Sequence, residues 1–107
     1  MLMKIVWGRV KPGTWGKYEE TYNRLLSTTA GDVPGLKHRM LARSVQDPDE
    51  GYSISFWDSK EEITAYKEST VFKEAILELD ECFEGTWWEK LYELRSGLYS
   101  RLTLAAS

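Results

Sequence analysis

The sequence is poor in the residue types that most often carry chemistry. Its 107 residues include one cysteine, Cys82, and one histidine, His38. A single cysteine excludes an intrachain disulfide and agrees with a reducing compartment. Lys4 and Arg9 interrupt the apolar amino-terminal segment before it reaches the length of a signal-peptide core or a membrane span. We therefore expect a cytoplasmic protein that does not contact a membrane.

An excess of charge of one sign is also absent. Fourteen basic and seventeen acidic residues give a formal net charge of −3, and the basic residues are spread along the chain. Such a distribution leaves no electrostatic footprint for nucleic acid. The sequence has no glycine fingerprint of dinucleotide-binding proteins, no phosphate-binding loop and no group of histidine, cysteine and carboxylate residues at metal-ligand spacing. We expect no nucleic-acid partner, no metal and no cofactor.

Aromatic residues and regular apolar spacing are abundant instead. There are five tryptophans, six tyrosines and three phenylalanines. Alternation of apolar and polar residues predicts strands over residues 3–11, 36–45, 52–57 and 86–95. Apolar residues three or four positions apart predict one helix that begins near Thr14 and another that begins after Ser59 and ends at Gly85.

Two serines mark the second helix. Ser59 is followed three residues later by Glu62, which is the spacing of a capping box. Ser69 and Thr70 offer a second cap inside the same apolar stripe. We therefore expect one helix with a break near Ser69.

The predicted order of elements is β-α-β-β-α-β. This is the ferredoxin-like pattern of the α+β class, an antiparallel four-stranded sheet with both helices on one face. Pro48 and Gly51 predict a hairpin loop, which makes the second and third strands antiparallel neighbours. We assign residues 1–95 to this domain and residues 96–107 to a C-terminal extension.

Both faces of the predicted sheet carry large side chains. On the last strand, Trp87 and Leu91 point to one side, and Trp88 and Tyr92 point to the other. An exposed apolar sheet promotes aggregation, so we expect a homodimer with twofold symmetry in which two sheets pack face to face. The apolar residues of the extension 96–107 predict an edge strand that contacts the partner subunit.

On the second strand, alternation separates two groups of residues. It puts Leu36, His38 and Met40 on one face, and Arg39 and Arg43 on the other. The two arginines either hold an anionic ligand or form ion pairs at a dimer interface.

Three segments carry a family resemblance. They are Gly35-Leu36-Lys37-His38-Arg39-Met40-Leu41, the strand and cap from Tyr52 to Glu62, and Ser69-Thr70-Val71-Phe72-Lys73-Glu74-Ala75 with Tyr66 before it. With them, nearly the whole chain resembles the antibiotic biosynthesis monooxygenase domain of the dimeric α/β barrel superfamily. Members of that family include oxygenases that act on polycyclic phenols and quinols without metal or flavin, haem-degrading enzymes, and small proteins without known activity.

The resemblance to the haem-degrading branch fails at two positions. The axial histidine of that branch corresponds to Ile76, and its helix tryptophan corresponds to Tyr66. Without an imidazole at Ile76, the protein offers iron no ligand on that side, and His38 is on a different element. We do not expect haem degradation.

The cofactor-independent oxygenase branch agrees better with the residues present. In that reaction a deprotonated phenol or quinol passes an electron to dioxygen, and the protein supplies a dry pocket and a place for the proton. We expect this pocket between the sheet and the helices. His38 is the candidate general base, because a neutral imidazole accepts a proton near pH 7. The candidate substrate-binding residues are Trp57, Tyr66 and Phe72.

Structural alternatives exist for each of these residues. Ordinary core packing explains Trp57 equally well and Tyr66 and Phe72 better, and a lone histidine on a strand is more often structural. The competing hypothesis is therefore a non-catalytic dimeric module of the same fold that binds a small molecule or another protein. Cys82 lies among acidic residues, which raise the pKa of a thiol, so we do not expect it to act as a nucleophile.

Overall fold

The computed structural model describes the backbone of residues 1–29 and 33–97 and the side chains of residues 1–25 and 33–97. The elements are β1 (Leu2–Arg9), α1 (Trp15–Thr29), β2 (Leu36–Arg43), β3 (Glu50–Trp57), α2 (Lys60–Glu68), α3 (Thr70–Asp80) and β4 (Trp88–Glu93). This order confirms the β-α-β-β-α-β prediction, with the second helix divided in two. Most of the extension 96–107, for which an edge strand is predicted, lies outside the described residues, which end at residue 97.

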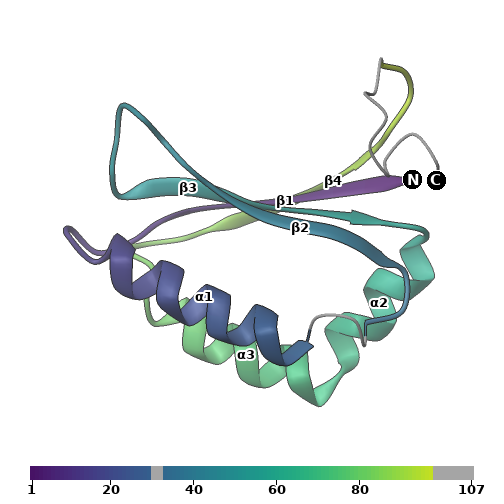
Figure 1. Cartoon of the computed structure of the whole chain (residues 1–107), viewed down its shortest axis with the longest axis horizontal. Helices are drawn as coiled ribbons and strands as arrows, with labels where there is room; N and C mark the ends of the chain where they lie inside the picture. The colour runs from purple at the N-terminus through teal and green to yellow at the C-terminus, as the bar shows by residue number, and fades with distance from the viewer. Residues whose placement is uncertain (30–32, 98–107) are drawn as a thin grey trace.

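The four strands form one antiparallel sheet in the order β2-β3-β1-β4. All three helices lie on one face of this sheet, and α1 and α3 run beside each other beneath it (Figure 1). The fold is therefore the ferredoxin-like α+β fold that the sequence predicts. No helix of the described segments covers the opposite face, which we call the open face (Figure 1).

The core lies between the sheet and α1. Trp15, Tyr18 and Tyr22 follow one another at intervals of three and four residues, and all three are buried. The Tyr18 ring packs against the Trp15 ring at 5.2 Å and against the Phe83 ring at 5.4 Å between centroids. Burial of each large apolar side chain contributes roughly 1.5–3 kcal/mol to folding, so this stripe holds α1 on the sheet.

Ser69 is the joint between α2 and α3. Its hydroxyl accepts a hydrogen bond from the Phe72 backbone N–H at 3.2 Å and donates one to the Tyr66 carbonyl oxygen at 2.6 Å. Its own backbone is extended, with φ −71° and ψ 150°, which ends one helix and begins the next. The predicted break at Ser69 is confirmed. The Ser59 cap is confirmed too, since its hydroxyl oxygen accepts from the Glu62 N–H at 3.3 Å.

The helix after this joint is shorter than the sequence predicts. α3 ends at Asp80 rather than at Gly85. Phe83 instead forms an isolated bridge with Val10 and packs beneath the sheet. Its apolar character reflects this packing and not a further helical turn.

The predicted faces of β2 are wrong at one residue. The register shifts between Leu36 and His38, so that Leu36 opposes Trp57 whereas His38 opposes Phe56. Because one irregular residue reverses the alternation of side chains, Leu36 lies on the face opposite to His38. The arginine Arg39 then lies on the same face as Leu36.

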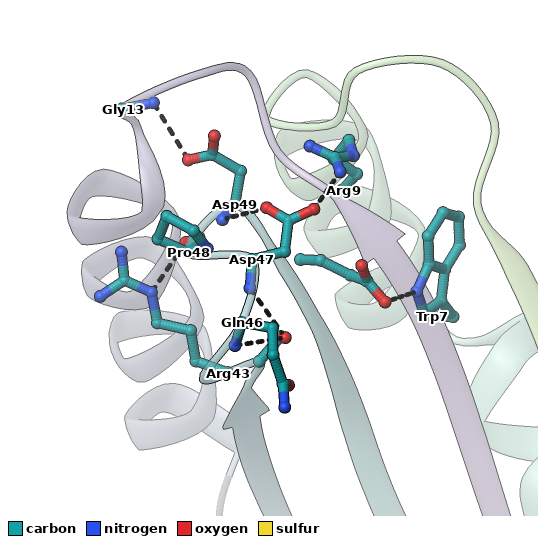
Figure 2. Close-up of polar contacts among 10 residues, drawn as sticks. Trp7, Arg9, Gly13, Arg43, Gln46, Asp47, Pro48 and Asp49 are labelled. Atoms are coloured by element: carbon teal, nitrogen blue, oxygen red, sulfur yellow. Dashed lines mark hydrogen bonds and ion pairs between the residues drawn. The ribbon is translucent and has the colours of Figure 1, made fainter.

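The loop between β2 and β3 is anchored to the amino-terminal part of the chain (Figure 2). The Asp49 carboxylate accepts a hydrogen bond from the Gly13 N–H at 3.1 Å, and the Asp47 carboxylate forms an ion pair with Arg9. Arg43 Nε donates to the Pro48 carbonyl oxygen at 2.7 Å (Figure 2). These contacts hold the hairpin that fixes the register of β2 on β3.

This register sorts the sheet residues into two sets, because directly opposed residues point to the same side. The face that meets the helices, the covered face, carries Lys4, Val6, Gly8, Arg39, Leu41, Gly51, Ser53 and Ser55. The open face carries Ile5, Trp7, His38, Met40, Tyr52, Ile54, Phe56, Trp88 and Tyr92. The covered face thus combines small, polar and charged residues with larger apolar ones such as Leu36, Leu41 and Trp57, whereas the open face is mostly large and apolar.

Candidate functional site

A cavity of about 90 Å³ lies between the covered face and the helices. The residues of its wall that matter for chemistry are Lys4, Tyr22, Arg39, Tyr66, Phe72 and Ile76. Ser53 and Ser55 of β3 form part of its roof. Their small side chains leave space that larger residues would fill in a close-packed interior.

The joint at Ser69 sets two aromatic side chains in the wall. Tyr66 comes from the last turns of α2 and Phe72 from the first turn of α3, and their rings meet edge to face with centroids 5.2 Å apart. The Tyr66 hydroxyl accepts a hydrogen bond from Arg39 Nη2 at 3.2 Å. The α2–α3 kink therefore positions both rings, and Arg39 orients one of them.

Lys4 is the buried charge of this site. The residue is 7% exposed, and its Nζ lies 3.6 Å from Glu89 Oε1. The ring centroids of Trp57 and Phe72 lie 5.9 and 5.6 Å from the same nitrogen. Burial lowers the pKa of Lys4, and this effect outweighs the attraction of Glu89, which raises it.

The neighbouring phenols stay neutral. Burial raises the pKa of Tyr22, whose hydroxyl lies 3.2 Å from Ser53 Oγ in a hydrogen bond. Burial also raises the pKa of Tyr18, which lines the same cavity. The wall therefore combines neutral hydroxyl groups with the side chains of Lys4 and Arg39.

The structure does not bring His38 into this cavity. The His38 ring lies on the open face, where it meets the Phe56 ring edge-on with centroids 6.1 Å apart. The thickness of the sheet separates it from Tyr66 and Phe72 on the covered face. A catalytic role for His38 stays a prediction, and within one subunit that role would be exerted on the other side of the sheet.

Trp57 lies behind the cavity wall rather than in it. Its side chain is completely buried, and its indole N–H donates to Ser55 Oγ at 2.8 Å. Its ring centroid lies 5.5 Å from that of Tyr66. Of the predicted site residues, Tyr66 and Phe72 thus line one cavity, and Trp57 packs against Tyr66 from the core side.

Sequence reasoning missed Lys4 as a site residue. The sequence does contain a hint, because Lys4 is a charged residue within a strand of apolar and β-branched residues. The same pattern is explained equally well by a charge that interrupts a potential membrane segment. The sequence predicts that Arg39 and Arg43 hold an anion or form ion pairs at an interface. Both point to the covered face, where the Arg43 guanidinium lies 5.4 Å from the Trp15 ring centroid, so they do not lie on the open face.

Other reactive groups are sparse in the part of the chain that the structure describes. Burial raises the pKa of the Cys82 thiol, and the carboxylates of Glu78 and Glu81 raise it further, while two nearby lysines act in the opposite direction. Within residues 1–29 and 33–97, no group of three His, Cys, Asp or Glu side chains could hold a metal ion. The helices among these residues are too short or too polar to cross a membrane.

Comparison with known proteins gives one family match and many structural ones. Residues 1–77 match the model of the family described as antibiotic biosynthesis monooxygenase. A variant of SnoaB, a cofactor-independent oxygenase from Streptomyces nogalater, is 16% identical with a TM-score of 0.81, over 92% of this chain and 97% of that chain. A conserved protein from Methanosarcina mazei Go1 is 18% identical with a TM-score of 0.78, over 89% of this chain and 94% of that chain. At such identities the likeness shows the fold. No curated protein matches the sequence.

Proposed function

Because the chain belongs to the antibiotic biosynthesis monooxygenase family, we propose that it oxidises a small phenol or quinol in the cavity under the sheet, without a cofactor. The observation that carries this proposal is the composition of the cavity wall, in which aromatic and aliphatic side chains surround Lys4 and Arg39. Flat rings pack well against such walls. A nearby positive charge favours the ionised form of a phenol, which is the form that reduces dioxygen.

The reaction balances without an external reductant. The substrate gains one oxygen atom of dioxygen and loses two hydrogen atoms, which leave with the second oxygen atom as water. The electrons come from the substrate ring itself. The protein binds and orients the ring, excludes water and receives the phenolic proton.

The size of the cavity favours a single ring. An engineered cavity of about 150 Å³ is known to hold benzene. The present cavity of about 90 Å³ is smaller. Tyr66, Phe72 and Ile76 line the cavity and are only half-buried, and we propose that these side chains turn outward to admit one ring. A polycyclic substrate needs a far larger rearrangement.

We propose further that the functional unit is a homodimer joined through the open faces. Four large side chains stay exposed there in the single chain, Met40 by 44%, Tyr52 by 38%, Trp88 by 37% and Tyr92 by 44%. Such a contiguous apolar surface is typical of an interaction site. Packing of two open faces would bury these residues and leave each cavity on the helix side of its own subunit.

A second candidate is a module that binds the same ligands without turnover. The position of His38 favours it, because the sequence contains no other histidine to act as a base in the cavity. The two candidates share the cavity and differ in oxygen consumption.

Oxygen uptake with a panel of hydroquinones, single-ring phenols and polycyclic phenols tests the proposal. We expect uptake with a single-ring member and a product that has gained one oxygen and lost two hydrogens by mass spectrometry. Ala75→Leu, which fills the cavity from α3, should reduce uptake by about tenfold or more, equivalent to 1.4 kcal/mol of transition-state binding. Leu77→Ala, on the exposed side of the same helix, should not. Binding without uptake by any member would establish the second candidate instead.

A further inference from the structure

Two lysines share one carboxylate beside the cavity. Lys4 Nζ lies 3.6 Å from Glu89, and Lys67 forms an ion pair with the other oxygen of the same carboxylate. Among residues 1–25 and 33–97, neither lysine forms an ion pair with a second acidic side chain. When both amines are protonated, the group of three therefore carries one net positive charge.

The contacts of Lys4 within the fold compensate its charge only in part. The Lys4 ammonium lies over the rings of Trp57 and Phe72, which attract a cation weakly, and an unbranched apolar side chain of similar length would also pack against these rings. Burial of an ammonium group costs several kcal/mol unless its charge is compensated. Glu89 compensates the charge of Lys4 only in part, because the same carboxylate also forms an ion pair with Lys67. A negatively charged group in the cavity would complete the compensation.

We infer that Lys4 binds the ionised oxygen of the cavity's ligand, so that the substrate class of this site is single-ring phenols and quinols held as their monoanions. The inference rests on the proposed function for the location of the site, but not on turnover. The charged groups that face Lys4 are Glu89 from β4, Lys67 from α2 and Arg39 from β2. Of these groups, Lys67 and Arg39 lower the pKa of Lys4 and Glu89 raises it.

The proton of the phenol has a defined destination in either state of Lys4. If the amine is neutral before binding, the phenolic O–H bond breaks and the proton moves to Nζ. If the amine is already protonated, the phenol releases its proton to solvent before it enters the cavity and binds as the anion. Both routes end in the same pair of phenolate and ammonium, which is the electron-rich form that the proposed oxidation needs.

The test uses the full chain and two ligands of similar size. The anion of para-nitrophenol absorbs visible light more strongly than the neutral phenol, so its absorbance reports ionisation, and nitrobenzene is the matched ligand without an ionisable oxygen. We expect the pKa of bound para-nitrophenol to lie about one unit or more below that of the free phenol, because a cation within a few ångströms has this effect. Lys4→Met should remove the shift and weaken binding of the anion by about tenfold, the factor that corresponds to one pKa unit.

Three controls separate charge from structure. The affinity of nitrobenzene for Lys4→Met should equal its affinity for the native protein. Lys4→Arg, which keeps the positive charge, should retain most of the shift. Lys90→Met removes a lysine that also lies over a tryptophan, 5.0 Å from the Trp88 ring centroid, but on the open face, and it should leave both ligands unaffected.

Two results overturn the inference. One is a shift that persists in Lys4→Met, and the other is failure of the native protein to bind either ligand. Should the shift depend on Lys4 while no phenol or quinol supports oxygen uptake, the inference stands and the monooxygenase proposal fails. Lys4→Met should also unfold at higher urea concentration than the native chain, since a desolvated ammonium is removed, so a folded variant is expected for the test.

Discussion

In the cavity region the covered face of the sheet carries serine and charged residues beside apolar ones, whereas the open face carries mostly large rings and aliphatic side chains. On the open face, Trp7 and Trp88 stack nearly parallel, with centroids 6.1 Å apart and an interplanar angle of 11°. On the covered face, Ser53 and Ser55 leave a cavity beside the buried ammonium of Lys4. The covered face thus contains a cavity and a buried charge. The side chains of the open face pack against one another but stay exposed.

In the isolated chain, each face of the sheet lacks a different kind of contact. A cavity and a partly compensated charge lower the stability of the covered face, and a small anionic ring would relieve both. Exposed apolar rings lower the solubility of the open face, and a second sheet would cover them. The proposed ligand would therefore fill the cavity and compensate the charge on the covered face. The proposed partner would cover the exposed rings on the open face of the same sheet.

Crowding of the covered face should change stability more than any other substitution proposed below. A Cβ at Gly51 would lie 2.2 Å from the Ala42 carbonyl oxygen and 2.4 Å from the Trp15 ring, so Gly51→Val must displace β2 or α1. We expect a loss of about 3 kcal/mol in the free energy of unfolding by urea titration. Gly16→Ala is the control, because nothing lies within 4 Å of its Cβ position, and it should gain about 0.5–1 kcal/mol. A loss below about 1 kcal/mol at Gly51 would show that this face is not tightly constrained.

The next effect concerns the open face. Trp88→Ala removes the ring that stacks on Trp7 and touches Tyr52. If the open faces form the dimer, loss of a buried tryptophan costs about 2 kcal/mol and raises the dimer Kd roughly 30-fold in analytical ultracentrifugation. Leu77→Ala, on the helix side, should leave the Kd unchanged. A native chain that sediments as a monomer at micromolar concentration would refute the dimer.

A smaller effect is the response of the core to alkaline pH. Tyr18 has a raised pKa in the folded protein because it is buried. The folded state therefore keeps its proton longer than the unfolded state does, and stability is lost as the pH rises above about 10. We expect the native chain to lose roughly 1 kcal/mol more than Tyr18→Phe between about pH 9 and pH 11. Equal losses of unfolding free energy in the two proteins would mean that Tyr18 ionises as readily in the folded state as in the unfolded state.

The smallest effect is expected at His38. Because the residue lies on the open face, His38→Ala should change oxygen uptake or ligand binding in the cavity by less than about threefold. Phe72→Ala, in the cavity wall, should lower both by more. A strong loss of uptake in His38→Ala with an intact dimer would move the reaction to the open side of the sheet.

Local chemistry explains which parts of the fold were predictable. The break at Ser69 follows from one hydroxyl that serves two helix ends, and the stripe of Trp15, Tyr18 and Tyr22 follows from helical spacing. The face of Leu36 relative to His38 was not predictable, because the register shift in β2 depends on pairing with β3 and leaves no mark in the residue pattern. The shortened α3 has a similar cause, since Phe83 is apolar for a contact with β1.

The amino-acid sequence determined the order of strands and helices, the positions of their caps and the presence of more large apolar residues than one core can bury. These properties depend on neighbours a few residues apart. The tertiary structure decided which residues share a space, because pairing of distant strands turns Lys4 and Arg39 toward Tyr66 and turns His38 away. A side chain's position across the sheet depends on register, and register is fixed only when the strands meet.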